Sequence, residues 1–248
     1  MMSLKEMLRQ ACPPMLWELA KSLRKRNAPP TRQYYGLQEL DRRIEQHVDF
    51  NNGFFIEIGG WDGVTFSNSL YFERFRNWRG LLIEPAPNEF LKCRVNRPDA
   101  TVVCSACVPF GYANTFLPMS YCASMTVAHS AHNAKNQLDD VRRHLDSGQQ
   151  FLKADETSFE FGARAAPLSQ ILDECAIDCT IDLLVLDVEG QELSVLQGID
   201  FARHAPRYIC VEVWKLDTIA SYLSSQGYRM VEQLTHMDDH QDFLFVRE

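Results

Sequence analysis

Short, unbroken apolar runs alternate with amphipathic segments through most of this chain. The runs at residues 54–58, 81–83 and 181–186 predict buried strands, because a central strand of a parallel sheet is covered on both faces. Between such runs, apolar residues recur at helical spacing, as in residues 36–48 and 67–76. Strands that alternate with helices indicate an α/β fold built on a parallel sheet.

The pattern continues to the end of the chain. Two more strands are expected at residues 101–104 and 208–213, and an extra strand at 114–118. The last two apolar runs, 228–234 and 242–246, lie close enough to pair as an antiparallel hairpin. Further helices are expected at residues 88–96, 167–175, 191–197 and around 219–227. We therefore predict a seven-stranded, mostly parallel sheet with an antiparallel terminal strand and helices on both faces.

A glycine-rich turn follows the first strand. It holds Gly59, Gly60 and Gly63, and a strand that ends in glycines lets the backbone approach a ligand closely. About twenty residues further on, the second strand stops at Glu84, and an acid at such a position typically accepts hydrogen bonds from ribose hydroxyls. This combination predicts a ligand that carries a ribose.

The details of the turn argue against a dinucleotide. The dinucleotide fingerprint G-x-G-x-x-G, counted from Gly59, would place glycines where this chain has Trp61 and Val64. Glu57 and Asp62 flank the bend, and these carboxylates would repel phosphates but suit the ammonium and sulfonium charges of S-adenosylmethionine. The turn therefore favours a cationic ligand.

Two stretches carry a family resemblance. EIGGWDGVTFSNSLYFERFRNWRGLLIEPAPNEF, at residues 57–90, and LLVLDVEGQELSVLQGIDF, at residues 183–201, resemble the FkbM-type S-adenosylmethionine-dependent methyltransferases. The most specific pieces are the glycine turn with Ser67-Asn68, the segment 78–85, and the run Asp187-Val188-Glu189-Gly190. The resemblance implies a Rossmann-like class I methyltransferase domain over residues 35–248, with S-adenosylmethionine as cofactor.

The turn, the strand-tip acid and the resemblance together predict which residues hold the cofactor. They are Glu57, Gly59, Gly60, Asp62, Gly63, Ser67, Asn68, Glu84, Pro85, Ser105 and Ala106. Ser105-Ala106 stands where related methyltransferases hold the adenine. Ser67 has a second interpretation as the cap of the helix that follows. Glu57 lies inside an apolar strand, where an unpaired carboxylate is costly, so it needs a partner, for which the ligand's amino group is one candidate.

Two acids at the tip of the fourth strand are the predicted catalytic residues. Asp187 is the first choice as the base that takes the proton from an acceptor hydroxyl, and Glu189 follows two residues later. Together they could raise one pKa or bind a divalent cation, although no metal site is predicted. In the alternative interpretation, Glu189 caps the helix after Gly190 and Asp187 only positions loops. Glu212 is a weaker third candidate.

Two segments lie outside the predicted sheet. Residues 1–34 form an N-terminal helical extension, interrupted by Pro13-Pro14, that lies on an anionic membrane surface or packs on protein. Residues 120–165 are a polar insertion near the ligand-binding edge of the sheet and a candidate substrate lid. Its histidines, His129, His132 and His144, could act as bases or metal ligands, though surface histidines in a polar insertion usually do neither.

Composition restricts the partners. Residues 1–50 hold nine Lys and Arg against six Asp and Glu, whereas the rest of the chain holds sixteen against twenty-seven. This acidic body argues against nucleic acid as the main partner. No apolar run is long enough to span a bilayer, no signal-peptide core is present, and the cysteines fit reduced thiols, so we expect a cytoplasmic protein with no stable membrane insertion. A homo-oligomer is compatible with the sequence.

The function expected from these observations is S-adenosylmethionine-dependent O-methylation of a hydroxyl on a sugar, glycan or small metabolite. The alternative is a catalytically silent protein that keeps the methyltransferase fold as a binding or trafficking module. A nicotinamide dehydrogenase is disfavoured by Trp61 and Val64 in the turn.

Overall fold

The computed structural model describes residues 32–129, 145–213, 216–236 and 241–248. By its internal contacts the chain divides into two units, Met1–Gln33 and Tyr34–Glu248, and the elements below belong to the second. The helical pieces predicted within residues 1–34 lie outside the described residues.

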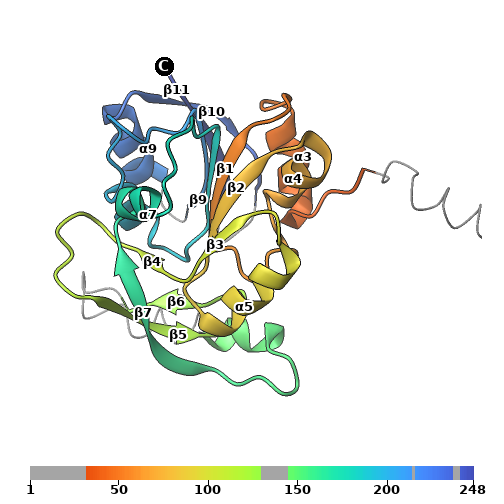
Figure 1. Cartoon of the computed structure of the whole chain (residues 1–248), viewed down its shortest axis with the longest axis vertical. Helices are drawn as coiled ribbons and strands as arrows, with labels where there is room; N and C mark the ends of the chain where they lie inside the picture. The colour runs from red at the N-terminus through yellow and green to blue at the C-terminus, as the bar shows by residue number, and fades with distance from the viewer. Residues whose placement is uncertain (1–31, 130–144, 214–215, 237–240) are drawn as a thin grey trace, which may run out of the picture. The chain divides into compact units, whose positions relative to one another are not determined.

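A seven-stranded sheet organises this unit (Figure 1), and it confirms the predicted fold class. Its strand order is β10-β11-β9-β8-β1-β2-β3. Neighbouring strands run parallel except for β11, which is antiparallel to both β9 and β10. The bounds are β1 Phe54–Ile58, β2 Arg79–Ile83, β3 Thr101–Val103, β8 Leu183–Leu186, β9 Tyr208–Val213, β10 Tyr228–Gln233 and β11 Gln241–Arg247.

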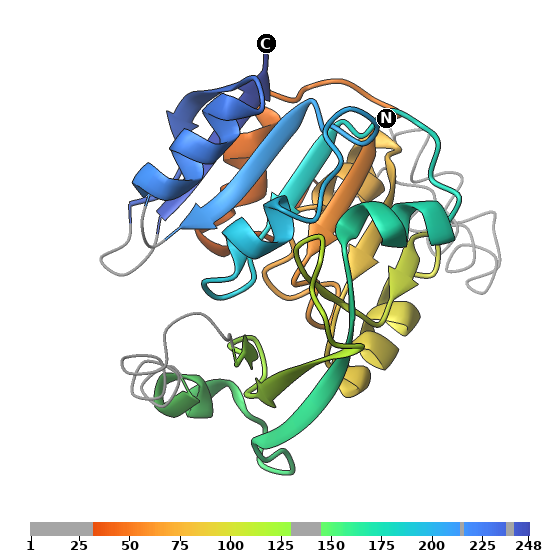
Figure 2. The same ribbon diagram turned by 90° about the vertical axis from the view of Figure 1, so that its left-hand side faces the viewer.

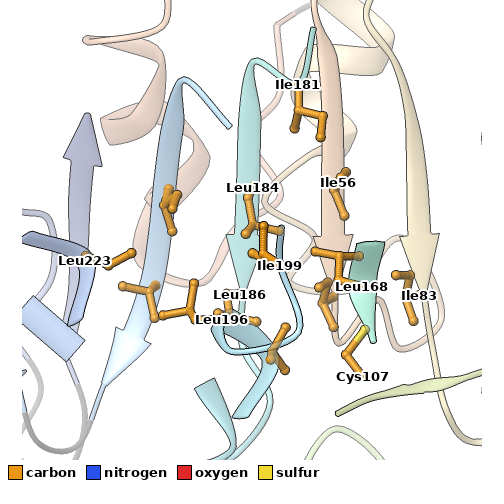
Figure 3. Close-up of a cluster of buried hydrophobic side chains, with 14 of the residues drawn as sticks. Ile56, Ile83, Cys107, Leu168, Ile181, Leu184, Leu186, Leu196, Ile199 and Leu223 are labelled. Carbon is orange, nitrogen blue, oxygen red and sulfur yellow. The ribbon is translucent and has the colours of Figure 1, made fainter. Parts of the chain in front are cut away.

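Helices cover both faces of this sheet because strand residues alternate between two apolar clusters. Ile56 and Ile58 of β1 face the cluster drawn in Figure 3, together with residues of α7, α8 and α9. Phe55 faces the opposite cluster, with residues of α3, α4 and α5. The helices are η1 Leu37–Glu39, α3 Leu40–Glu45, α4 Leu70–Arg76, α5 Pro87–Asn96, η2 Gln149–Phe151, α7 Leu168–Glu174, α8 Glu192–Leu196 and α9 Leu216–Ser225. No helix in these stretches is long and apolar enough to cross a membrane.

A second, four-stranded sheet of order β4-β7-β5-β6 lies beyond the carboxyl ends of the parallel strands (Figure 2). Its strands are β4 Ala106–Cys107, β5 Phe116–Tyr121, β6 Val127–Ala128 and β7 Phe159–Ala166. The extra strand predicted at 114–118 is β5, displaced by a few residues. The two ends of the segment predicted as a lid, residues 120–128 and 159–165, contribute strands to this sheet. His132 and His144 lie outside the described residues.

Candidate functional site

A pocket opens between the carboxyl ends of β1, β2 and β8 and one face of the second sheet. The space within it is about 630 Å³, part of it open to solvent. The lining residues from the main sheet and its turns are Ile58, Gly59, Trp61, Glu84, Pro85, Ser105, Asp187, Val188, Glu189, Gln191 and Val195. The second sheet and its loops contribute Ala106, Cys107, Leu117, Met119, Ala123, Ser124, Thr126 and Ala128.

Glu84 leaves the end of β2 and is 5% exposed. Its Oε2 accepts a hydrogen bond from the Trp61 amide at 2.8 Å, and its Oε1 accepts one from the Ala86 amide at 2.8 Å. Burial raises the pKa of Glu84 to about 8, although the two amides oppose the shift. Because each carboxylate oxygen can accept two hydrogen bonds, Glu84 can still accept from two ligand hydroxyls.

Asp187 follows β8 and is half-buried in the pocket wall. Burial raises its pKa, and the charges of Asp242, Glu192 and Glu57 raise it further. Its carboxylate receives no hydrogen bond from the residues that the structure describes. A carboxyl group with a raised pKa and unused acceptor capacity has the properties of a general base.

Gly59 allows the strand ends to meet at this place. Its φ is +89°, and a Cβ there would lie 1.9 Å from the Asp187 carbonyl oxygen. A side chain at this position would therefore push β1 and β8 apart.

Glu189 also lines the pocket, with a φ of +54°. The N-cap of α8 is Gln191, which forms no side-chain capping bond, and Oε1 of Glu192 accepts from the Gly190 amide at 2.9 Å.

Glu212 stands on β9, opposite Asp242 of β11 in the antiparallel register. Burial raises its pKa strongly, and nearby acids led by Asp187 add to the shift. Glu212 does not line the pocket.

Seven of the predicted residues are brought together by the pocket: Gly59, Glu84, Pro85, Ser105, Ala106, Asp187 and Glu189. Six others do not line it: Glu57, Gly60, Asp62, Gly63, Ser67 and Asn68. Both carboxylates in the second group have donors within the protein. Oδ1 of Asp62 accepts from the amides of Val64 at 2.9 Å and Thr65 at 2.7 Å, and its Oδ2 accepts from the Thr65 hydroxyl at 2.8 Å.

Glu57 is enclosed more completely. Its Oε1 accepts from the Asn68 amide at 2.7 Å, and its Oε2 accepts from the hydroxyls of Ser67 at 2.8 Å and Ser69 at 2.6 Å. The guanidinium of Arg97 lies 3.7 Å from the same Oε2. Ser67 also accepts from the Leu70 amide at the start of α4, although the N-cap residue of that helix is Ser69.

Sequence reasoning placed Ala106 at the site but did not name Leu117 or Met119 of the second sheet. Leu117 and Met119 face the pocket from β5, whereas Phe116 and Pro118, which alternate with them, are exposed. This alternation of exposure is the period of a strand with one covered face, but Phe116 is apolar as well, so the sequence shows no alternation of apolar and polar residues here. His129 is not part of the wall, and its Nε2 lies 2.6 Å from the Ser120 hydroxyl.

The described residues contain no group of three or more His, Cys, Asp or Glu arranged to hold a metal ion. The pocket offers the acceptor oxygens of Glu84, which fit the hydroxyls of an uncharged ribose, and exposed backbone at Gly59.

Comparison with known proteins identifies a family. The sequence model of the methyltransferase FkbM domain matches residues 57–230. No curated protein sequence matches the chain.

Three solved structures are similar over most of the chain. Precorrin-6y C5,15-methyltransferase from Geobacter metallireducens GS-15 has 12% identity, a TM-score of 0.43, and coverage of 89% of this chain and 90% of that one. The Methanococcus jannaschii fibrillarin pre-rRNA processing protein has 12% identity, a TM-score of 0.46, and coverage of 80% and 68%. A TehB-like SAM-dependent methyltransferase from Corynebacterium glutamicum ATCC 13032 Kitasato has 10% identity, a TM-score of 0.42, and coverage of 95% and 100%.

Proposed function

The chain belongs to the methyltransferase FkbM domain family, and from this premise we propose that it uses S-adenosylmethionine to methylate a hydroxyl group of a sugar or small metabolite. The observation that supports the proposal is the convergence of Glu84, Gly59 and Asp187 on one pocket, although 103 positions separate the last residue from Glu84. Glu84 suits the ribose of the cofactor, and Gly59 lets the backbone approach the cofactor closely. Asp187 suits the deprotonation of an acceptor.

Glu84 would hold the cofactor through its ribose hydroxyls. Pro85, Ser105 and Ala106 line the adjoining wall and provide a mainly apolar surface for the adenine. S-adenosylmethionine, when bound, supplies an electrophilic methyl group. The remaining work falls to residues of this chain, which orient the acceptor, keep water out and take up a proton.

Asp187 is the residue proposed to take that proton. Transfer of the proton from the acceptor hydroxyl to the Asp187 carboxylate leaves an oxygen that can attack the methyl group. The raised pKa of Asp187 makes this carboxylate a stronger base. Glu189 lines the same wall and would orient the acceptor. Leu117 and Met119, both less than a tenth exposed, would limit its size and exclude water.

The acceptor is proposed to be small because the body of the protein is acidic. Residues 51–248 hold sixteen Lys and Arg against twenty-seven Asp and Glu, and such a surface opposes the approach of a phosphate backbone.

Isothermal titration with S-adenosylhomocysteine, and separately with NAD, tests the cofactor assignment. We expect binding of the first and none of the second. If S-adenosylhomocysteine does not bind, the proposal fails and the silent binding module is favoured. Radiolabelled S-adenosylmethionine with a panel of sugars, hydroxylated metabolites and amines then tests the acceptor class, and label transfer to amines alone would contradict O-methylation.

A further inference from the structure

Arg97, at the end of α5, is fully buried although it is a charged residue. All five N–H groups of its guanidinium form hydrogen bonds within the protein. Nε and Nη2 donate to Oε2 of Glu73 at 3.0 and 2.8 Å. Nη1 donates to the Gly63 carbonyl at 3.0 Å and the Ser67 hydroxyl at 3.1 Å, and Nη2 also donates to the Ser69 hydroxyl at 3.0 Å. The guanidinium also lies over the Phe55 ring, 5.3 Å from its centroid.

The bond to Gly63 connects Arg97 to the turn that carries two pocket residues. This turn, residues 59–66, presents Gly59 and Trp61 to the pocket. The neighbouring Asn96 acts in the same way, because its Nδ2 donates to the Asp62 carbonyl at 2.8 Å. Two successive side chains at the end of α5 thus donate to two successive carbonyls of the turn, those of Asp62 and Gly63, neither of which lines the pocket.

The contact between Arg97 and the turn requires a glycine at position 63. Its φ is +80°, and a Cβ there would lie 2.8 Å from Cγ of Arg97 and 2.9 Å from Sγ of Cys93. The absence of a side chain at Gly63 therefore makes room for the arginine stem, in a place where the sequence suggested room for a ligand.

Two serines connect Arg97 to Glu57 through hydrogen bonds. Ser67 and Ser69 each accept from the guanidinium and donate to Oε2 of Glu57. The buried carboxylate of β1 is in this way joined to the turn and to α4 without any contact to the pocket. Because the hydrogen bonds of the network are fully formed, they fix one geometry of the turn.

We propose that Arg97 is a positioning residue for cofactor binding, which holds the turn at residues 59–66 in its binding geometry, and that Glu57 acts through Arg97 rather than on the cofactor. This inference rests on the proposed function, because the turn is assigned to S-adenosylmethionine. An arginine is required at this position because lysine has three donors in place of five and no planar fork.

Arg97→Lys tests the proposal, since it retains the charge and loses the fork. We expect the Kd for S-adenosylhomocysteine, measured by calorimetry where circular dichroism shows a folded protein, to rise about tenfold. Hydrogen exchange of the peptide that covers residues 59–66 should become faster as well.

Arg76→Lys is the matched control. Arg76 is also largely buried and donates to Glu45 and to the Asp49 carbonyl, but none of these residues belongs to the turn or lines the pocket. This variant should lower Tm to a similar extent, with an unchanged Kd and unchanged exchange at residues 59–66. Equal loss of affinity in both variants would show a general loss of stability and overturn the proposal.

The triple variant Glu57→Gln/Glu73→Gln/Arg97→Met covers the case in which Arg97→Lys does not fold. It removes the arginine together with both carboxylates that lie against it, so that neither Glu57 nor Glu73 is left without its cation. We expect it to fold with weakened S-adenosylhomocysteine binding, and wild-type affinity in either Arg97 variant would overturn the inference. A wild-type protein that binds no S-adenosylhomocysteine would refute the proposed function instead.

Discussion

Two pairs of acidic residues at the same end of the parallel sheet have opposite surroundings. Glu57 and Asp62 receive hydrogen bonds from amides and hydroxyls of the protein at both of their oxygens. Glu84 and Asp187 line the pocket; Glu84 accepts one amide per oxygen, and Asp187 accepts no hydrogen bond from the described part of the chain. The first pair fixes the protein's own backbone, whereas the second pair retains capacity for a ligand.

The difference shows that the supply of donors, more than position near a glycine turn, decides the role of a buried acid. A carboxylate whose hydrogen bonds are all formed internally stabilises the fold, and removal of its partners is costly. A carboxylate that is desolvated with fewer such partners holds its proton more tightly, as the raised pKa values of Glu84 and Asp187 indicate. The following experiments test this division.

The largest effect is expected for Asp187→Asn. Loss of the proposed base should reduce kcat by about 100-fold or more, while the Kd for S-adenosylhomocysteine stays within about threefold of wild type, because Asp187 is assigned to the acceptor. Single-turnover kinetics with an acceptor from the panel, beside calorimetry, would separate the two quantities. Normal turnover would move the base to another residue of the pocket wall.

Glu84→Gln should mainly weaken cofactor binding. Loss of hydrogen bonds from the ribose hydroxyls to the Glu84 carboxyl group should raise the Kd for S-adenosylhomocysteine by about 10- to 100-fold. Asp182→Asn is the matched control, because Asp182 is also buried but lies before β8 at the opposite end of the sheet, where it accepts from the Phe54 amide. Its replacement should reduce stability without change in Kd. An unaltered Kd in Glu84→Gln would end the ribose assignment.

Glu84 also predicts a pH dependence of stability for the ligand-free protein. The folded protein holds the Glu84 proton up to about pH 8, whereas the unfolded chain releases it near the ordinary value of 4.5. The native state therefore binds more protons between these values, and the free energy of unfolding falls as pH rises. Between pH 5.5 and 7.5 we expect urea unfolding to show a decrease of roughly 2 kcal/mol in wild type relative to Glu84→Gln. Parallel curves for the two proteins would contradict the raised pKa of the buried Glu84.

The smallest effect on binding is expected for Asp62→Asn. The amide oxygen can still accept from the Val64 and Thr65 amides, but the bond from the Thr65 hydroxyl is weakened. We expect a loss of about 1 kcal/mol in unfolding free energy and a Kd for S-adenosylhomocysteine within about threefold of wild type. A much larger loss of affinity, without loss of stability, would transfer Asp62 to the ligand-binding pair.

Local sequence patterns were sufficient for the framework. Apolar runs and helical spacing predicted the seven strands and the helices on both faces, because burial imposes a period that short segments reveal on their own. The strand tips that carry Glu84 and Asp187 followed from the same pattern, since parallel strands place their carboxyl ends at one edge.

Only the tertiary structure decided which acids remain open to a ligand. Arg97 lies forty positions after Glu57, and it meets the glycine turn because α5 packs against the same face of the sheet as Phe55. Leu117 and Met119 reach the pocket because the pairing of β5 with β7 brings a separate sheet to the strand ends. Strand and helix formation depend on neighbours along the chain. The hydrogen-bond donors around a buried carboxylate come instead from segments that are distant in the sequence and packed beside it, and local sequence does not determine which segments these are.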